Sequence, residues 1–467
     1  MLIIDTQIQP QDLQKKIDQM WALSAEKILS IAATHQGNSP APVFTVNGKY
    51  TAKGWTQWTQ GFQYGSAILQ FQATGETAFL KLGKHDTLNH MADHLTHFGV
   101  HDHGFNNIST YGNLLRLMNQ GKIAEDPCER NYYSLALKVS GAVQAKRWIQ
   151  IHDRTGFVYS FNGPHSLFAD TIRSMRSLAL AHQLGHSLLD EHDQQVSLYS
   201  RLVQHAINTS KYIVFFGKGR DQYDIPGRVA HEAIFNLNDG QFRCPSTQQG
   251  YSPFTTWTRG LAWIILGYAE QIEFLETQTD QSLATLKPLS SRQAIYQMFL
   301  KTALATADFY LQQMPADGIP YWDTGAPNLH KIKDYHHRPA DPTNDFEPVD
   351  SSAAAIAAQG LIRLGHYLKN HQQEKLGDKY LQAGLTILNT LLDTPYLSKN
   401  VEHQGLLLHS IYHHPNGWDQ IPSGKKIPSG QSSMWGDYHL REAVTLVQSL
   451  NSSSYDQFFI SDENKNH

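Results

Sequence analysis

The sequence predicts an all-α protein, an (α/α)6 barrel in which six helical hairpins form a ring. Apolar residues recur every three or four positions along most of the 467 residues, which is the period of an amphipathic helix. Strand-like pieces are short and do not alternate regularly with helices, so a parallel α/β sheet is disfavoured. An α-solenoid would need a repeat of fixed period, and the sequence has none.

About twelve helices are expected, with Gly, Pro, Asn or Asp at the breaks between them. Their approximate ranges are 10–34, 56–73, 76–97, 107–120, 128–147, 168–184, 190–211, 254–278, 291–315, 350–369, 371–393 and 437–450. Short β pieces are expected in the loops, in KRWIQIHD, GFVYSF and KYIVFFG. The segments 213–252, 316–349 and 394–436 are too long for simple turns, and such loops often build a site. No Pro/Ser-rich linker divides the chain, so residues 1–467 are expected to form a single catalytic domain.

Composition narrows the class of protein. Hydrophobic residues make up 40% of the chain and aromatic residues 11%, enough to build a large core. The formal net charge is −4 and no long Lys/Arg run occurs, so neither nucleic acid nor a membrane is expected as a partner. The two cysteines, Cys128 and Cys244, exclude a disulfide framework. Without a recognisable signal peptide or transmembrane segment, a cytoplasmic location is expected, and the oligomeric state stays unknown.

The first motif that could carry chemistry is VHDHGFNN, in which Asp102 precedes a helix expected to begin near Ile108. A carboxylate in a polar, Gly-containing loop can point into a cavity. The plainer interpretation is that Asp102 caps the helix or pairs with a neighbouring histidine.

The second motif is GPHSLFADTIRSMRSLALAHQLG, where Ser166 is expected as the N-cap and Asp170 in the first helical turn. The helix dipole, together with Arg173 and Arg176, would lower the pKa of Asp170, whereas an acid catalyst needs a raised pKa. A catalytic role therefore requires Asp170 to be buried and to face another carboxylate, for which Asp102 is the natural candidate.

The third motif, CPSTQQGYSPFTTWTRGLAWIILGYAEQ, joins a loop that holds Gln249 to a helix expected to begin near Pro253. Arg259 and Trp263 lie four residues apart on one helix face. A fork-shaped donor beside an indole suits a ligand that has a carboxylate and a flat sugar face, although core packing is a strong alternative for Trp263.

Two further motifs indicate mainly architecture. EPVDSSAAAIAAQGLIRLG is a helix rich in small residues that opens at Asp350 or Ser351. SMWGDYHLREAV opens the last helix, where Asp437 is interpreted as a capping acid.

The histidines His90, His94, His97 and His101 form a stripe that runs into Asp102 and His103. Clusters of imidazole and carboxylate can bind zinc or manganese. No metal is expected here, because the chain contains 25 histidines in general and lacks an HExxH motif.

Taken together, these motifs resemble family 88 of the glycoside hydrolases, the unsaturated glucuronyl hydrolases. The resemblance covers residues 55 to 445 and rests on HDHGF, FADTIRSM, TQQGYSPFTTWTRGLAW, GIPYWDTGAP, PVDSSAAAIAA and WGDYHLREA, which occur in the family's order. The chain departs from the family pattern in ADTIRSM, at Gln63 in GFQYG and at Trp435 in WGDYH. These departures bear on subsite preference rather than on the fold.

The resemblance implies an (α/α)6 barrel with no cofactor, acting on oligosaccharides with a 4,5-unsaturated uronic acid at the non-reducing end, as left by a polysaccharide lyase. By matching positions, Asp170 resembles the general acid/base and Asp102 its partner carboxylate. His231, Gln249, Arg259 and Trp263 match substrate-binding positions. The implied reaction hydrates the enol-ether double bond and needs no nucleophilic side chain.

Alternatives remain open from the sequence alone. An unsaturated rhamnogalacturonyl hydrolase would share the architecture and differ in the sugar next to the uronate. A sugar epimerase on an α/α barrel would use histidines as acid and base. A noncatalytic sugar-binding scaffold is a third alternative.

Overall fold

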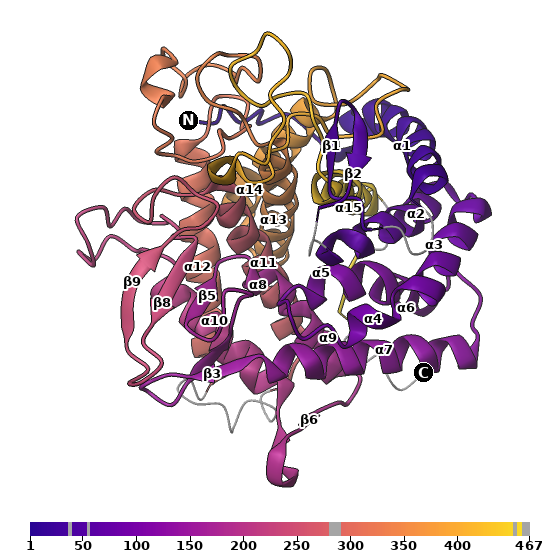
Figure 1. Cartoon of the computed structure of the whole chain (residues 1–467), viewed down its shortest axis with the longest axis vertical. Coiled ribbons are helices and arrows are strands. Elements are labelled where there is room, and N and C mark those ends of the chain that lie inside the picture. The colour runs from indigo at the N-terminus through magenta and orange to yellow at the C-terminus, as the bar shows by residue number, and fades with distance from the viewer. Residues whose placement is uncertain (36–39, 54–56, 280–290, 452–454, 460–467) are drawn as a thin grey trace.

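The computed structural model describes residues 1–35, 40–53, 57–279, 291–451 and 455–459, and Figure 1 shows their arrangement. Helices form most of the molecule, with long loops before α13 and α15 drawn in orange and yellow at the top of the figure. Within the described ranges, no helix has the length and apolar character needed to cross a bilayer.

Six helical segments of the described chain form an inner layer, and most of their residues are buried. They are α2 (Gln60–Thr74), α5 to α6 (His103–Asn107, a π-helical turn at Ile108–Gly112, then Asn113–Asn119), α8 with α9 (Thr171–Ser174, Arg176–Gln183), α11 (Thr258–Glu276), α13 (Ser351–Asn370) and α15 (Met434–Leu450). Contacts close the ring: α2 lies between α5 and α15, α13 between α15 and α11, and α8 between α11 and α5.

Six outer helices surround this ring and bury one face each, as amphipathic helices do. They are α1 (Gln14–Thr34), α3 (Thr77–His90), α7 (Pro127–Lys146), α10 (Leu198–Tyr212), α12 (Arg292–Gln313) and α14 (Glu374–Leu391), counted in the described residues. α1 and α3 pack on α2, α7 and α10 on α9, α12 on α11, and α14 on α13. The predicted (α/α)6 barrel is therefore confirmed.

The strands are short, antiparallel and confined to loops, as predicted. β5 (Ser166–Phe168), β8 (Glu232–Phe235) and β9 (Phe242–Ser246) form a three-stranded sheet. The other strands pair in twos: β1 (Phe44–Val46) with β2 (Lys49–Thr51), β3 (Trp148–Gln150) with β4 (Gly156–Val158), and β6 (Leu188–Leu189) with β7 (Gln195–Val196).

Several predicted helix boundaries are wrong, and sheet pairing explains two of them. Ser166 is not an N-cap, because it pairs with Ile234 in the sheet and its hydroxyl bonds to Glu232 at 2.5 Å. The helix after it begins at Thr171 and has Asp170 at the N-cap. The helix expected from residue 190 begins at Leu198, because residues 188 to 196 form the hairpin of β6 and β7.

Charged side chains fill part of the interior between the inner helices. Arg173 on α8 bonds to Glu270 on α11 at 2.9 Å and to Glu442 on α15 at 2.8 Å. Arg176 also lies beside both carboxylates. Ions buried this deeply are tolerated because each is paired with an opposite charge. The ion pairs also connect three inner helices.

Two inner helices, α5 and α8, come into close contact at Gly104 on α5. Its amide donates a hydrogen bond to the Ser174 hydroxyl at 2.9 Å, and a Cβ at this position would collide with the Ser174 backbone. Gly61 makes a similar approach to the backbone of Asn106. Only glycine allows backbones to come this close, so Gly104 sets the distance between α5 and α8, and Gly61 sets that between α2 and α5.

We expect Gly104→Ala to lower stability by about 1–3 kcal/mol, because the added methyl forces α5 away from α8 in a densely packed interior. Urea denaturation measures the change. Gly112→Ala is the matched control, since a Cβ at this buried helical glycine would meet the flexible Ile108 side chain at 3.0 Å. Equal stability of the two variants would contradict a special role for Gly104.

Candidate active site

A pocket lies where the inner helices begin, with a volume of about 830 Å³ that includes open solvent at its mouth. Its lining residues are Trp58, Val100, His101, Asp102, Phe105, Phe161, Asp170, Gln248, Gln249, Trp257, Arg259, Trp263, Tyr412, His413, Asn416 and Trp418. Two of the three long loops predicted from the sequence contribute to this wall, those that carry Gln249 and Trp418. The structure therefore places these two long loops at the pocket, and their role in a site remains a prediction.

The inner helices point their amino ends toward this pocket. Residues at or just before the first turns of α2, α5, α8 and α11 line it directly. α13 and α15 begin beside it, where Asp350 bonds to Arg259 and Trp435 stacks on Trp58. Helix amino ends carry partial positive charge, so the pocket favours an anionic ligand.

Asp102 and Asp170 occupy equivalent positions on neighbouring helices. Each is the N-cap residue of its helix, α5 and α8, yet neither side chain accepts a capping hydrogen bond. The capping interpretation of Asp102 is therefore wrong for its side chain. Both carboxylates are buried, with 7% and 9% of each residue exposed.

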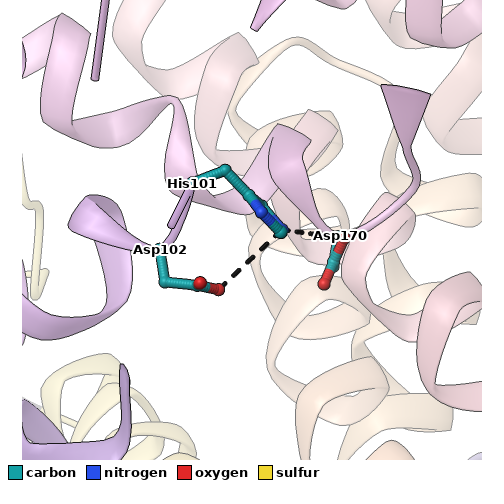
Figure 2. Close-up of side chains that lie close together, drawn as sticks. All are labelled: His101, Asp102 and Asp170. Atoms are coloured by element: carbon teal, nitrogen blue, oxygen red, sulfur yellow. Dashed lines mark ion pairs between the residues drawn. The ribbon is translucent and has the colours of Figure 1, made fainter. Parts of the chain in front are cut away.

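Figure 2 shows the imidazole of His101 between these carboxylates. Its Nε2 lies 3.5 Å from Oδ1 of Asp170 and 3.9 Å from Oδ1 of Asp102. The ring is 1% exposed and packs between Phe161 and Phe168. The sequence places His101 only in a metal-binding stripe, although its position directly before Asp102 was a usable signal.

The pKa values of the two carboxyl groups are driven apart, as a proton-transfer pair requires. Burial raises the pKa of Asp102, and the charge of Asp170 adds to this against the opposing effect of His101. Burial also acts to raise the pKa of Asp170, but the charge and the close contact of His101 more than offset it and leave it lowered. The raised pKa expected of Asp170 is therefore wrong for the free protein, because His101 lies beside it.

The predicted influence of Arg173 and Arg176 on Asp170 is also replaced by that of His101. Both arginines are paired with the buried carboxylates of Glu270 and Glu442. The histidine that contacts Asp170 decides its ionisation, and the distant arginines do not.

The histidines of the stripe do not gather at one point in the described chain. His94 bonds to Asn106, while His103 bonds to Ser140 and to a backbone carbonyl. In the part of the chain that the structure describes, one group of potential ligand atoms converges, that of His101, Asp102 and Asp170, within 4.8 Å of one another. Two carboxylates and an imidazole at this spacing also suit proton transfer.

Arg259 is at the pocket wall, and its guanidinium bonds mostly to protein. Nη1 donates to Asp350 at 2.5 Å and to the Ile411 carbonyl, and Nη2 donates to the Tyr412 carbonyl at 2.7 Å. Nη2 also donates to Oε1 of Gln249 at 2.9 Å. Arg259 therefore joins the start of α13 to two loops of the site, and its carboxylate-binding role remains a prediction.

The bond from Arg259 fixes the amide of Gln249. Because a guanidinium can only donate, Oε1 of Gln249 must face it, which leaves Nε2 of Gln249 as a donor beside the pocket.

His231 supports the same loop from behind and is not among the described residues that line the pocket. Its Nδ1 accepts from the amides of Gln248 at 2.9 Å and Gln249 at 3.2 Å. Its Nε2 must therefore carry the proton, and burial lowers its pKa to about 3, so the ring is neutral.

Aromatic rings form much of the remaining wall. Trp263 lines the pocket although only 3% of it is exposed, because its other edges pack on Phe105 and His439. The predicted site position and the core-packing alternative therefore both apply to this side chain. Indole faces of this kind can pack against sugar rings.

The acids of the two architectural motifs have structural partners. Asp350 caps α13 through the amide of Ser352 and is fully buried. Asp437 accepts from Tyr50 and from the amides of Leu406 and Leu407. The predicted capping role of Asp437 is therefore wrong, because Ser433 caps this helix and Asp437 anchors a loop instead.

We expect Arg259→Ala to weaken both ligand binding and the fold, since it leaves the buried Asp350 without its cation, a loss of about 3–5 kcal/mol. Gln249→Ala should weaken ligand binding while the melting temperature stays unchanged, because this side chain is half-buried at the wall. Calorimetry of both variants separates the two effects. Wild-type stability in Arg259→Ala would contradict the structural role of Arg259.

A search of protein families finds no match to this chain. Individual proteins do match. An unsaturated glucuronyl hydrolase of Formosa agariphila is 26% identical over 396 residues, which are 84% of this chain and 80% of that protein. One from Bacillus sp. strain GL1 is 25% identical over 438 residues, covering 92% and 97%. An unsaturated chondroitin disaccharide hydrolase of Streptococcus agalactiae is 23% identical, covering 87% and 84%.

Solved structures agree in fold. An unsaturated glucuronyl hydrolase specific for heparin superposes with a TM-score of 0.70 at 20% identity and covers 94% of this chain and 98% of its own. The Bacillus sp. GL1 enzyme gives a TM-score of 0.68 at 22% identity, covering 95% and 98%. The predicted resemblance to the unsaturated glucuronyl hydrolases is therefore confirmed, in sequence and in fold, over more than four fifths of the chain.

Proposed function

We propose that the protein is a hydrolase of oligosaccharides that carry a 4,5-unsaturated uronic acid at the non-reducing end. The convergence of Asp102, Asp170 and His101 in one buried cluster at the pocket wall is the observation that carries this proposal. The named relatives and the anion-favouring helix ends support it.

The proposed reaction is a hydration. Protonated Asp170 delivers its proton to C4 of the enol ether, and water, activated by the resulting carboxylate, adds to C5. Asp102, when ionised, stabilises the positive charge that develops near C5. The hemiketal formed in this way collapses and releases a 4-deoxy-5-keto uronate and the remaining saccharide.

The substrate itself supports the protonation of Asp170. Its uronate carboxylate brings a negative charge into the pocket and displaces water, and both changes raise the pKa of a nearby carboxyl. Asp170 is therefore ionised in the free protein and takes up a proton when the ligand binds, as general acid catalysis requires.

We assign substrate binding to other residues of the pocket lining and of the loop behind it. Nε2 of Gln249 donates to the uronate, Arg259 holds that amide and adds positive charge, and Trp263 packs against the sugar face. His231 acts through the loop of Gln248 and Gln249 that it supports.

The wider setting follows from the chemistry of the substrate. An eliminating polysaccharide lyase must act first, since it creates the unsaturated ring. One hydrophobic core runs from Leu2 to Phe459, which supports a single catalytic domain. Cys128 and Cys244 are both free and exposed, which supports a reducing, cytoplasmic location.

We expect Asp170→Asn to lower kcat roughly 10²–10⁴-fold, the usual cost of losing a general acid/base, while substrate binding stays measurable. The assay follows the loss of ultraviolet absorbance of the conjugated enol ether in lyase-generated disaccharides. Asp437→Asn is the control, because this acid is also buried but lies outside the described pocket lining. A loss of only a few-fold in Asp170→Asn would reject its role.

The same assay separates the alternatives. Disaccharides from glycosaminoglycans and from pectin distinguish a glucuronyl from a rhamnogalacturonyl hydrolase. A sugar epimerase would leave the absorbance of every lyase product unchanged. Protein stripped of metal is expected to stay active, and restoration of a lost activity by a divalent cation would contradict the proposal that no cofactor is needed.

A further inference from the structure

We propose that His101 is the proton reservoir of the site, a positioning residue that passes its proton to Asp170 when the substrate requires it. This inference rests on the proposed function and names the source of the proton that Asp170 delivers.

The ring of His101 lies where its Nε2 has carboxylate oxygens as neighbours. Its Nε2 faces Oδ1 of Asp170 at 3.5 Å and Oδ1 of Asp102 at 3.9 Å. Neither ring nitrogen has a hydrogen-bond partner among the described residues, and neither does Oδ1 of Asp170. A buried polar atom without a partner is costly, so this pair of atoms is poised to share a proton.

The neighbouring histidines differ from His101, because at least one ring nitrogen of each already has a hydrogen-bond partner. Backbone amides fix the acceptor nitrogen of His231 and of His205, and both nitrogens of His103 are bonded. Burial lowers the pKa of each to about 3, so they remain neutral. For His101, burial also lowers the pKa, but Asp102 and Asp170 more than offset it and leave it raised.

The backbone of His101 is held as firmly as its ring. Its carbonyl accepts from Gln144 at 2.8 Å and from Ser174 at 2.6 Å. The ring stacks on Phe161 at 6.0 Å between centroids and meets Phe168 edge-on at 5.7 Å. His101 is therefore held in place, and a small approach of the Asp170 side chain to Nε2 completes the hydrogen bond along which the proton moves.

The relay balances in atoms and charge. The Nε2–H bond of the His101 imidazolium breaks as an O–H bond forms on Asp170. Asp170 then gives this proton to C4 of the substrate. Water adds to C5 through its oxygen and releases a proton to the Asp170 carboxylate, from which it returns to Nε2. One water is consumed and neither oxidant nor reductant is needed.

The charges that face His101 are Asp102, Asp170 and Arg147, together with the neutral rings of His205 and His231. With His101 present, the fall of kcat/KM at alkaline pH reflects the loss of the proton from the His101 imidazole, because this ring supplies the proton to Asp170. Without it, Asp170 must hold its own proton, and a carboxyl gives up a proton about 2–3 pH units below an imidazole.

The test is the pH profile of kcat/KM for His101→Gln, with His205→Gln as the matched control at a buried, neutral histidine. We expect the alkaline limb of His101→Gln to move to lower pH by about one unit or more, and activity at neutral pH to fall ~10–100-fold. The limb of His205→Gln should stay at the wild-type pH. The proposal would be overturned if kcat/KM of His101→Gln fell by the same factor at every pH, with the alkaline limb at its wild-type position.

A second measurement needs no substrate and no stable His101 variant. Histidine-selective NMR of the whole enzyme should show one histidine that titrates above its ordinary pKa, and Asp170→Asn should lower that value. A titration unchanged by Asp170→Asn would overturn the pairing. If the NMR titration shows that His101 and Asp170 are paired but no unsaturated disaccharide is consumed, the proposed function is wrong. If disaccharides are consumed but the alkaline limb of His101→Gln stays at the wild-type pH, only the role of His101 as proton reservoir is rejected.

Discussion

The site depends on how closely α5 can approach α8. Two carboxylates at the N-cap positions of neighbouring helices meet only if the backbones behind them come into contact, and Gly104 against Ser174 provides that contact. The same Ser174 hydroxyl donates to the carbonyl of His101. One point of packing therefore sets the positions of Asp102, His101 and Asp170 together.

Helix amino ends shape the rest of the pocket. Six inner helices begin at or beside the same cavity, so the partial positive charge of their amino ends favours an anion there, independently of the side chains. The same field would keep both acids ionised if they were hydrated. Burial opposes this effect of the helix ends and raises the pKa of Asp102, whereas the imidazole of His101 leaves the pKa of Asp170 lowered. Two aspartates in equivalent positions therefore differ in pKa.

Much of the fold was predictable because helical periodicity is a local property. All twelve expected segments correspond to helices of the barrel, and Asp102, Gln249, Arg259 and Trp263 lie at one pocket with Asp170, as expected. The errors come from long-range contacts. Ser166 looks like a cap until β8 pairs with its strand, and Arg259 looks free to bind a ligand until Asp350 and the loop of Tyr412 occupy it. His101 was undervalued because its partner Asp170 lies 69 residues away in the sequence.

The central claim is that Asp102 and Asp170 form one coupled chemical unit. Its most direct test is a double-mutant cycle of kcat/KM, measured for Asp102→Asn, Asp170→Asn and the double variant. Residues that act as a unit are strongly non-additive, so the double variant should be hardly slower than Asp170→Asn alone. Losses that multiply would contradict the claim and indicate two acids that work independently.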